Sequence, residues 1–305
     1  MVKTYRKILE EGAKLLETAG TENFQFEAAE LMGKALGEDC RSERYRKRLD
    51  DPSDAKLRDK FFEYCERRKK GEPLQYIIGE WEFYGITFKV GEGVLIPRQD
   101  TETVVETVIK KMSGKENLVL TDLCSGSGCI AVSLEKNLSC KKVICVEKSD
   151  KAAEYLAENI KLNNSCAEVV KGDVLDDSTA EKLPAADIIV CNPPYLTAED
   201  MKNLQKEVSF EPETALYGGE DGLDFYRNIT RIWKSRLKEG GMLAYEIGIN
   251  QEDEVMRILI QHGFENVRCR TDLCGINRCV FGFLPVSTNE IGIKIDFDRI
   301  NGEHE

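Results

Sequence analysis

Hydrophobic residues in the first quarter of the chain recur every three or four positions, which places them on one face of a helix. Four segments carry this pattern, and three of them stop at a glycine: Gly20, Gly37 and Gly71. Glycine is common just past a helix end because it adopts the left-handed conformation there at little cost. The pattern therefore predicts a small helical bundle over residues 1–73.

The pattern changes to alternation between Trp81 and Val90, where apolar side chains occupy nearly every second position. A period of two is typical of a strand with one buried face. Because Tyr84-Gly85 interrupts the run, we expect two short strands that turn there and pair as a hairpin. Residues 74–95 would then link the bundle to the rest of the chain.

Short apolar runs alternate with amphipathic segments from residue 96 onward. A helix is expected from about Ile96 to Met112, with Asp100 or Thr101 as its N-cap. Strands are expected at residues 118–123, 142–147, 168–171, 188–191, 241–247, 266–270 and 278–284. Helices are expected at residues 129–137, 151–163, 224–238 and 251–263.

This alternation predicts an α/β fold, in which a mostly parallel sheet carries helices on both faces. The last two strands have no helix between them, so they should pair antiparallel. Residues 96–285 would form this domain. The tail, residues 286–305, has no clear partner in the pattern.

The four residues Asn192-Pro193-Pro194-Tyr195 directly follow the strand expected at 188–191. Proline lacks a backbone N–H and restricts the residue before it, so carbonyl groups here stay free to accept hydrogen bonds. The side chains of Asn192 and Tyr195 add an amide and a flat apolar wall. This set suits an uncharged planar –NH2 group, as on adenine, cytosine, guanine or glutamine. Asn192 is alternatively a turn amide that satisfies backbone groups.

A glycine-rich turn follows the first strand of the expected sheet and opens the next helix. Glycines let a ligand approach the backbone, and a helix N-terminus favours negative charge. The candidate binding residues here are Asp122, Cys124, Ser125, Gly126, Ser127 and Gly128. Because Gly126-x-Gly128-x-x-Ala131 also fits a relaxed dinucleotide fingerprint, a nicotinamide-dependent oxidoreductase is an alternative.

Acidic residues near this turn favour a different cofactor. Asp122 would repel a pyrophosphate but attract the ammonium group of a methionine moiety. Glu147 can accept hydrogen bonds from both hydroxyls of a ribose. Asp173-Val174 can bind the edge of an adenine and pack against its face. With Asn192 at the reacting end, the set predicts S-adenosylmethionine. Taken singly, Glu147 is also explained as a helix-capping acid and Asp173 as a turn residue.

Composition narrows the classes of function. A net charge of −12 argues against long nucleic acid as the sole partner. Basic residues do gather at residues 41–48 and 67–70, where a solvated helix face is favoured over a docking surface for a partner that carries RNA. The eleven cysteines include no Cys-x-x-Cys pair and there are two histidines, so no metal site is expected. We expect a reduced, cytoplasmic chain with no membrane span.

Together these residues resemble class I methyltransferases that act on planar nitrogens. Three further stretches, residues 71–85, 95–102 and 211–226, make the chain similar to the peptide chain release factor glutamine methyltransferases over residues 5–284. That family commonly has proline at Gln99, glycine at Cys124 and aspartate at Glu147. None of these departures removes a group that the chemistry needs. Residues 286–305 extend beyond the family's usual end.

The resemblance implies a Rossmann-like sheet of seven strands and an S-adenosylmethionine-dependent protein-glutamine N-methyltransferase. Its substrate would be the glutamine of the Gly-Gly-Gln loop in bacterial class 1 release factors, which the N-terminal bundle would help to hold. We expect the Asn192 side-chain oxygen and the Pro193 carbonyl to accept hydrogen bonds from the two N–H groups of the substrate amide. Pro194 would complete the substrate-binding rim, and Tyr195 would pack against the amide plane or the flanking peptide. No general base is expected, since a side chain cannot realistically deprotonate an amide.

Other functions stay open at this point. An amino methyltransferase for DNA or RNA bases would use the same rim to hold a flipped base. A non-catalytic binding module is disfavoured, because every polar group that catalysis needs is present. We expect a monomer.

Overall fold

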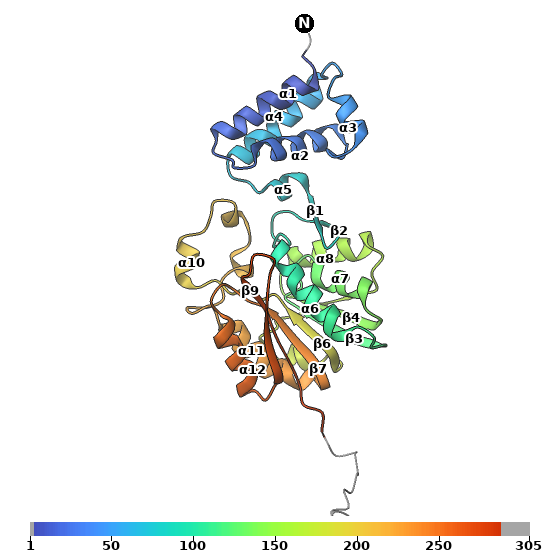
Figure 1. Cartoon of the computed structure of the whole chain (residues 1–305), viewed down its shortest axis with the longest axis vertical. Helices are drawn as coiled ribbons and strands as arrows, with labels where there is room; N and C mark the ends of the chain where they lie inside the picture. The colour runs from blue at the N-terminus through green and yellow to red at the C-terminus, as the bar shows by residue number, and fades with distance from the viewer. Residues whose placement is uncertain (1–2, 288–305) are drawn as a thin grey trace, which may run out of the picture.

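The computed structural model describes residues 3–287, so the expectation for the tail falls almost entirely outside the described residues. The N-terminal helices form a body of their own at one end of the molecule (Figure 1). They are α1 (Tyr5–Thr18), α2 (Phe24–Leu36), α3 (Glu43–Arg48) and α4 (Ala55–Lys69). The predicted helical bundle is confirmed.

Local capping and one shared core explain why these four segments fold as helices. Ser42 caps α3 and Asp54 caps α4, each by accepting a backbone N–H with its side chain. Leu16, Leu31 and Phe61, from three different helices, are fully buried together. Most of the clustered basic side chains of this region pair with acids on the bundle surface, which supports the interpretation as a solvated face. These pairs include Arg44–Glu38, Lys47–Glu43, Arg67–Glu72 and Lys69–Glu66.

Arg68 is the exception among these basic residues because its guanidinium is buried. It pairs with Glu27 of α2 and, at 3.0 Å, with Glu207 in the long segment that follows β6 (Ala186–Cys191). That segment contains α10 (Ala198–Lys202) and approaches the bundle in Figure 1. The bundle and the segment after β6 are therefore joined by an ion pair.

The linker contains the predicted hairpin and one helix that the sequence pattern did not predict. The hairpin pairs β1 (Glu80–Phe83) with β2 (Ile86–Lys89), and the turn at Tyr84-Gly85 lies where it was expected. Helix α5 (Leu74–Ile78) precedes it. With five residues, α5 is too short to show a helical period.

One buried side chain fastens the hairpin to the domain that follows. The Asn159 amide accepts a hydrogen bond from Lys89 N at 2.6 Å and donates to Lys89 O at 3.0 Å. It also donates to Ser127 O at 2.9 Å, in the turn after β3 (Leu118–Leu123). The carboxamide of Asn159, in α8 (Asp150–Leu162), thus connects the hairpin with the glycine-rich turn.

The large sheet has seven strands in the order β5-β4-β3-β6-β7-β9-β8. The neighbours from β5 to β7 pair parallel, whereas β9 pairs antiparallel with both β7 and β8. The predicted α/β sheet and its antiparallel end are confirmed. The strands are β3 (Leu118–Leu123), β4 (Cys140–Glu147), β5 (Glu168–Lys171), β6 (Ala186–Cys191), β7 (Leu237–Glu246), β8 (Glu265–Thr271) and β9 (Asn277–Phe283).

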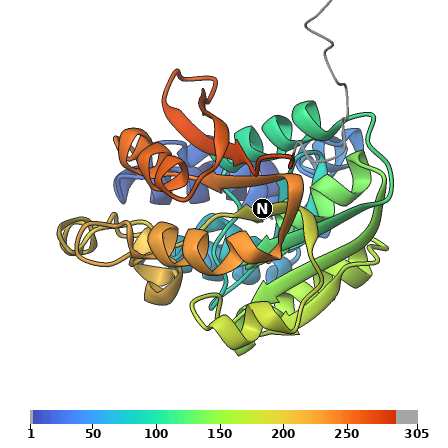
Figure 2. The same ribbon diagram turned by 90° about the horizontal axis from the view of Figure 1, so that it is seen from below.

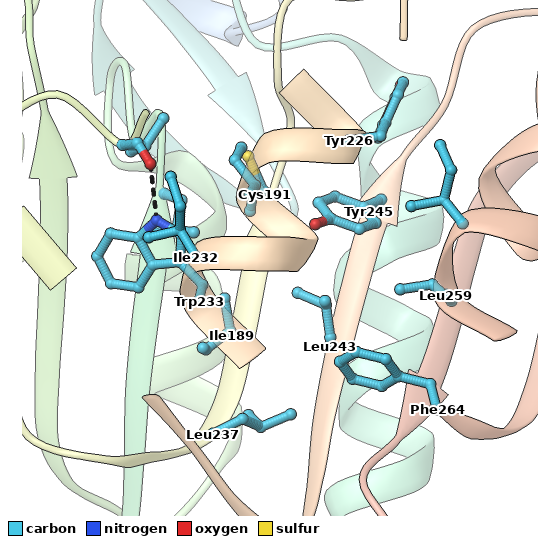
Figure 3. Close-up of a cluster of buried hydrophobic side chains, with 14 of the residues drawn as sticks. Ile189, Cys191, Tyr226, Ile232, Trp233, Leu237, Leu243, Tyr245, Leu259 and Phe264 are labelled. Atoms are coloured by element: carbon cyan, nitrogen blue, oxygen red, sulfur yellow. Dashed lines mark hydrogen bonds between the residues drawn. The ribbon is translucent and has the colours of Figure 1, made fainter. Parts of the chain in front are cut away.

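Helices cover both faces of the sheet, as the view from below shows (Figure 2). One buried cluster joins the sheet to α6 (Glu102–Met112), α7 (Cys129–Asn137) and α8 (Asp150–Leu162). The other joins it to α9 (Asp177–Glu181), α11 (Asp224–Trp233) and α12 (Glu252–Gln261). In that second cluster the Trp233 indole packs near Ile189 and donates to Val174 O at 2.8 Å (Figure 3).

The expected end of one helix and the expected start of the strand after it are wrong. The helix expected to run from 224 to 238 ends at Trp233 and passes through a short 3-10 helix into β7, which begins at Leu237. The polar residues at 238–241 hide the start of that strand, because its first half is not fully buried. Thr101 occupies the N-cap position of α6, but its side chain caps nothing.

Candidate active site

A cavity of about 680 Å³ opens at the carboxyl ends of the parallel strands. The turns after β3, β4, β5 and β6 all contribute to its wall, as is general for ligand sites in open α/β sheets. Its volume is in the range of small-molecule sites. Of the predicted site residues, those that line it are Cys124, Ser125, Gly126, Ser127, Glu147, Asp173, Val174, Asn192 and Pro194.

Glu147 lies at the end of β4, with its carboxylate held by two backbone groups. One oxygen accepts from Gly126 N at 2.8 Å and the other from Ser149 N at 2.7 Å. Ser149 is the N-cap of α8, so the interpretation of Glu147 as an acid near a helix start describes part of its role. Each carboxylate oxygen can accept more than one hydrogen bond, so Glu147 keeps acceptor capacity on the cavity side.

Asp173 is held in a similar way after β5. One oxygen accepts from Leu175 N at 2.9 Å, and the other pairs with Lys148 at 2.8 Å. Burial opposes its ionisation, but these contacts outweigh burial and lower the pKa of the carboxyl. Val174 beside it is almost fully buried and lines the cavity. This end of the cavity offers two fixed carboxylates, a set that suits hydroxyl and amino groups.

The glycine-rich turn connects this end to β3. Gly126 lines the cavity, but Gly128 does not: a Cβ at Gly128 would lie 2.5 Å from Leu156 Cδ1, and its φ is +81°. Gly128 therefore allows α7 to start against α8. Cys124, which also lines the cavity, has a φ of +57°, a conformation that costs a non-glycine residue about 1–2 kcal/mol.

Asp122 lies within β3 and is 1% exposed, so the structure does not bring it to the cavity wall. Both of its carboxylate oxygens are buried without a hydrogen-bond partner among the described residues. Burial raises the pKa of this carboxyl to about 8. Its contact with a methionine moiety stays a prediction.

The Asn192–Tyr195 rim closes the other end of the cavity. Asn192 Nδ2 lies 3.4 Å from Thr101 Oγ1, which also lines the cavity, and Pro194 forms part of the wall. Pro193 carries no lining side chain, and its predicted role concerns its carbonyl. The Tyr195 ring packs against the core cluster and its hydroxyl lies 3.4 Å from Glu246 Oε1, so packing against a substrate stays a prediction.

The rim is braced by segments far away in the sequence. Gln251 Nε2 donates to Tyr195 O at 3.0 Å. The backbone of Leu196 exchanges hydrogen bonds with Leu216 and Gly218 at 2.9 and 2.8 Å. A Cβ at Gly218 would lie only 2.6 Å from Pro194 O, so a glycine is required there by close packing.

Residues 212–217 contribute the outer wall, and Glu211 fixes this segment. Its buried carboxylate accepts from Ile96 N at 3.1 Å and pairs with Arg98, another lining residue. The Arg98–Glu211 pair thus connects two of the stretches on which the resemblance rests. Glu211 thus holds the outer wall against the segment that contains Ile96 and Arg98.

Comparison with known proteins assigns the chain to a family. The domain family described as "PrmC N-terminal domain" matches residues 7–79, and "Methyltransferase small domain" matches residues 98–216. The release factor glutamine methyltransferase of Clostridium botulinum is 35% identical over 282 residues, or 90% of this chain and 97% of that protein. The one from Geobacter sulfurreducens is 37% identical over 284 residues, or 92% and 96%.

The chain belongs to the release factor glutamine methyltransferase family. Family membership makes it a methyltransferase and excludes both the oxidoreductase and the non-catalytic module. The solved methyltransferase from Pyrococcus furiosus aligns with a TM-score of 0.51 at 18% identity, covering 67% of this chain and 91% of that one. This likeness shows the class I methyltransferase fold, as predicted.

Two further features concern metal binding and membrane spans. Between residues 3 and 287, no group of three or more His, Cys, Asp or Glu side chains is arranged to hold a metal ion. Within the same range, no helix combines the length and apolar character needed to cross a membrane.

Sequence reasoning missed several residues that contact or support the rim. Thr101 was predicted as a helix cap, and Gln251 and Gly218 were not singled out for the site. Glu246 was also missed, although it left a signal: it is the one acid within the apolar run 242–247. An acid in a buried strand needs a compensating reason, since burial of an unpaired charge is costly.

Proposed function

We propose that this chain transfers a methyl group from S-adenosylmethionine to the side-chain amide nitrogen of the glutamine in the Gly-Gly-Gln loop of bacterial class 1 peptide chain release factors. One observation carries this proposal. Asn192 and Pro194 line the same cavity as Glu147 and Asp173. Acceptors for a neutral –NH2 group thus share one space with acceptors for a nucleoside.

The residues present fit S-adenosylmethionine. Glu147 would accept the two ribose hydroxyls with its remaining lone pairs, and Asp173 would accept from the adenine amino group. Val174 would pack against the adenine face. Both unpartnered oxygens of Asp122 lie in the strand that leads to the turn, where the positive charge of the methionine ammonium would favour their ionised form. When bound, the cofactor supplies a methyl group on a positively charged sulfur.

The rim residues would orient the glutamine amide. Asn192 Nδ2 faces Thr101, so its Oδ1 is left to accept one amide N–H, while the Pro193 carbonyl accepts the other. These two bonds place the nitrogen for in-line attack and favour the positive charge that develops on it. Holding the reacting groups in line and excluding water account for most of the rate gain. The surplus proton leaves to water after transfer, so no general base is required.

The test is methylation of a purified release factor, followed by mass spectrometry. The expected result is one added methyl group, mapped to the loop glutamine, and its absence with Asn192→Ala. A release factor whose loop glutamine is replaced by alanine is the matched substrate control. Labelled methyl appearing in DNA or rRNA, but not in the release factor, would establish the nucleic-acid alternative instead.

Three further expectations belong to this proposal. Residues 1–73 would help to hold the release factor, with residues 74–95 as linker and 96–285 as the catalytic domain. The enzyme would act as a monomer in the cytoplasm. Sedimentation of the chain with and without a release factor tests both the binding of the release factor and the monomeric state.

A further inference from the structure

The orientation of the Asn192 amide decides whether the rim presents an acceptor or a donor to the substrate. A carboxamide has an oxygen end and an –NH2 end of nearly equal shape. Its –NH2 end faces Thr101 Oγ1 at 3.4 Å. A hydroxyl can both donate and accept, so Thr101 alone would tolerate either orientation.

Glu246 supplies the missing constraint. It lies at the end of β7, is 2% exposed, and is close enough for the Thr101 hydroxyl to stabilise its charged form. Its Oε2 is buried and has no hydrogen-bond partner among the described residues that meets the usual geometry. An ionised carboxylate only accepts hydrogen bonds. A Thr101 proton turned toward Glu246 would leave the Thr101 lone pair for Asn192.

We propose that Glu246 is a positioning residue whose ionised carboxylate sets the direction of the hydrogen bonds from Asn192 through Thr101, and so keeps the Asn192 oxygen toward the substrate. This inference rests on the proposed function of Asn192. The same carboxylate accepts from the Tyr195 hydroxyl at 3.4 Å. Glu246 thus holds both ends of the rim.

Protonation of Glu246 would remove the constraint. Burial raises the pKa of this carboxyl to about 7, although Thr101 and Arg278 oppose the shift. A protonated Glu246 can donate to Thr101, which then donates onward, and the Asn192 oxygen turns away from the substrate. The rate constant kcat should therefore be full above this pKa and fall as pH drops through about 7.

The other groups that face Glu246 do not account for such a pH dependence. Arg278 stays charged, and its partners Asp100 and Asp272 keep it in ion pairs at 2.9 and 3.1 Å. The remaining titratable groups that sense Glu246 ionise far above neutral pH, because burial raises the pKa of each. They are Tyr195, Tyr226, Cys129, Cys191 and Cys279.

The experiment compares Glu246→Gln with wild type at pH 6–9, using release factor methylation and cofactor titration. Glutamine keeps the shape but brings its own donor, so it no longer enforces one direction. We expect kcat to fall roughly tenfold or more, the scale of misplaced reacting groups. The affinity for S-adenosylmethionine should stay within about twofold, and the acid limb near pH 7 should disappear.

Two variants at Thr101 separate positioning from a structural role. Thr101→Val keeps the side-chain shape and removes the hydroxyl, so it should reproduce the loss in kcat. Thr101→Ser restores the hydroxyl and should recover a large part of it. Equal losses for Val and Ser, or an acid limb that persists in Glu246→Gln, would overturn the inference.

A readout without substrate keeps this inference separate from the proposed function. With asparagine labelled by ¹⁵N, the side-chain signals of Asn192 are identified by their absence in Asn192→Ala. They should shift with a midpoint near pH 7 in the wild type but not in Glu246→Gln. Shifts that are the same in both proteins refute the role of Glu246. A wild-type enzyme that leaves release factors unmethylated refutes only the proposed function.

Discussion

The two ends of the cavity are built differently. At the end with Glu147 and Asp173, each carboxylate oxygen is held by a backbone N–H or a lysine from its own or the adjacent turn. At the Asn192 end, the supporting groups come from two segments that are far from the rim in sequence, one with Thr101 and the other with Glu246 and Gln251. The proposed binding residues are thus fixed locally, whereas the proposed positioning residues are fixed by the tertiary fold.

This difference teaches where precision is needed. A cofactor-binding carboxylate tolerates small displacements, because hydroxyl groups can follow it. An acceptor that orients a nitrogen for in-line attack loses much of its value when it moves by an ångström. Contacts from several elements restrict such movement more strongly than one turn can. Changes at the rim should therefore act on kcat, and changes at the other end on cofactor affinity.

The largest effect is expected from Asn192→Ala. Loss of one of two acceptors leaves the substrate nitrogen unoriented, so kcat should fall on the order of a hundredfold or more. Cofactor affinity should stay largely intact in calorimetry, since Glu147 and Asp173 are unchanged. A near-normal rate would show that Asn192 does not contribute to catalysis. It would also contradict the proposed difference between the two ends of the cavity.

Glu147→Ala should produce the opposite pattern. Removing charge-assisted hydrogen bonds should weaken cofactor binding by about 1.5–3 kcal/mol, with kcat at saturating cofactor much less affected. Titration calorimetry measures this directly. Glu147→Asp is the matched control, because it keeps the carboxylate, and it should recover most of the affinity. Unchanged affinity in the alanine variant would contradict the ribose assignment.

Gly218→Ala tests whether distant segments hold the rim. The added Cβ would come within 2.6 Å of Pro194 O and 2.7 Å of the Tyr195 Cα, so the rim must move. We expect kcat to fall about tenfold with little change in cofactor affinity. Gly114→Ala is the control: no atom lies within 4 Å of its Cβ, but its φ is +81°. It should cost stability without lowering kcat.

The smallest effect is expected from Cys124→Gly. Glycine relieves the left-handed backbone strain of about 1–2 kcal/mol but loses the packing of the thiol against the core cluster. The free energy of unfolding, measured in denaturant, should change by less than about 1 kcal/mol. A large loss would show that the thiol contributes more to this turn than the backbone conformation costs.

Prediction from sequence succeeded where structure is local. Glu147 is the last residue of one strand and Asp173 lies two residues after another, so a strand pattern alone locates them at the sheet edge. Glu246 and Thr101 could not be paired in this way, because 145 residues separate them and only the folded sheet brings them together. Helix α5 was not predicted for another reason: its five residues contain barely more than one turn. The fold class was predictable because it depends on the order of many segments rather than on any single boundary.

The carboxamide of Asn159 has a consequence for how the molecule comes apart. Separating the hairpin from the helix that carries Asn159 would break both of its hydrogen bonds to Lys89, and the same carboxamide also holds Ser127 O in the glycine-rich turn. Each such hydrogen bond contributes roughly 0.5–1.5 kcal/mol to stability. The linker and the glycine-rich turn should therefore melt in a single cooperative transition rather than in sequence.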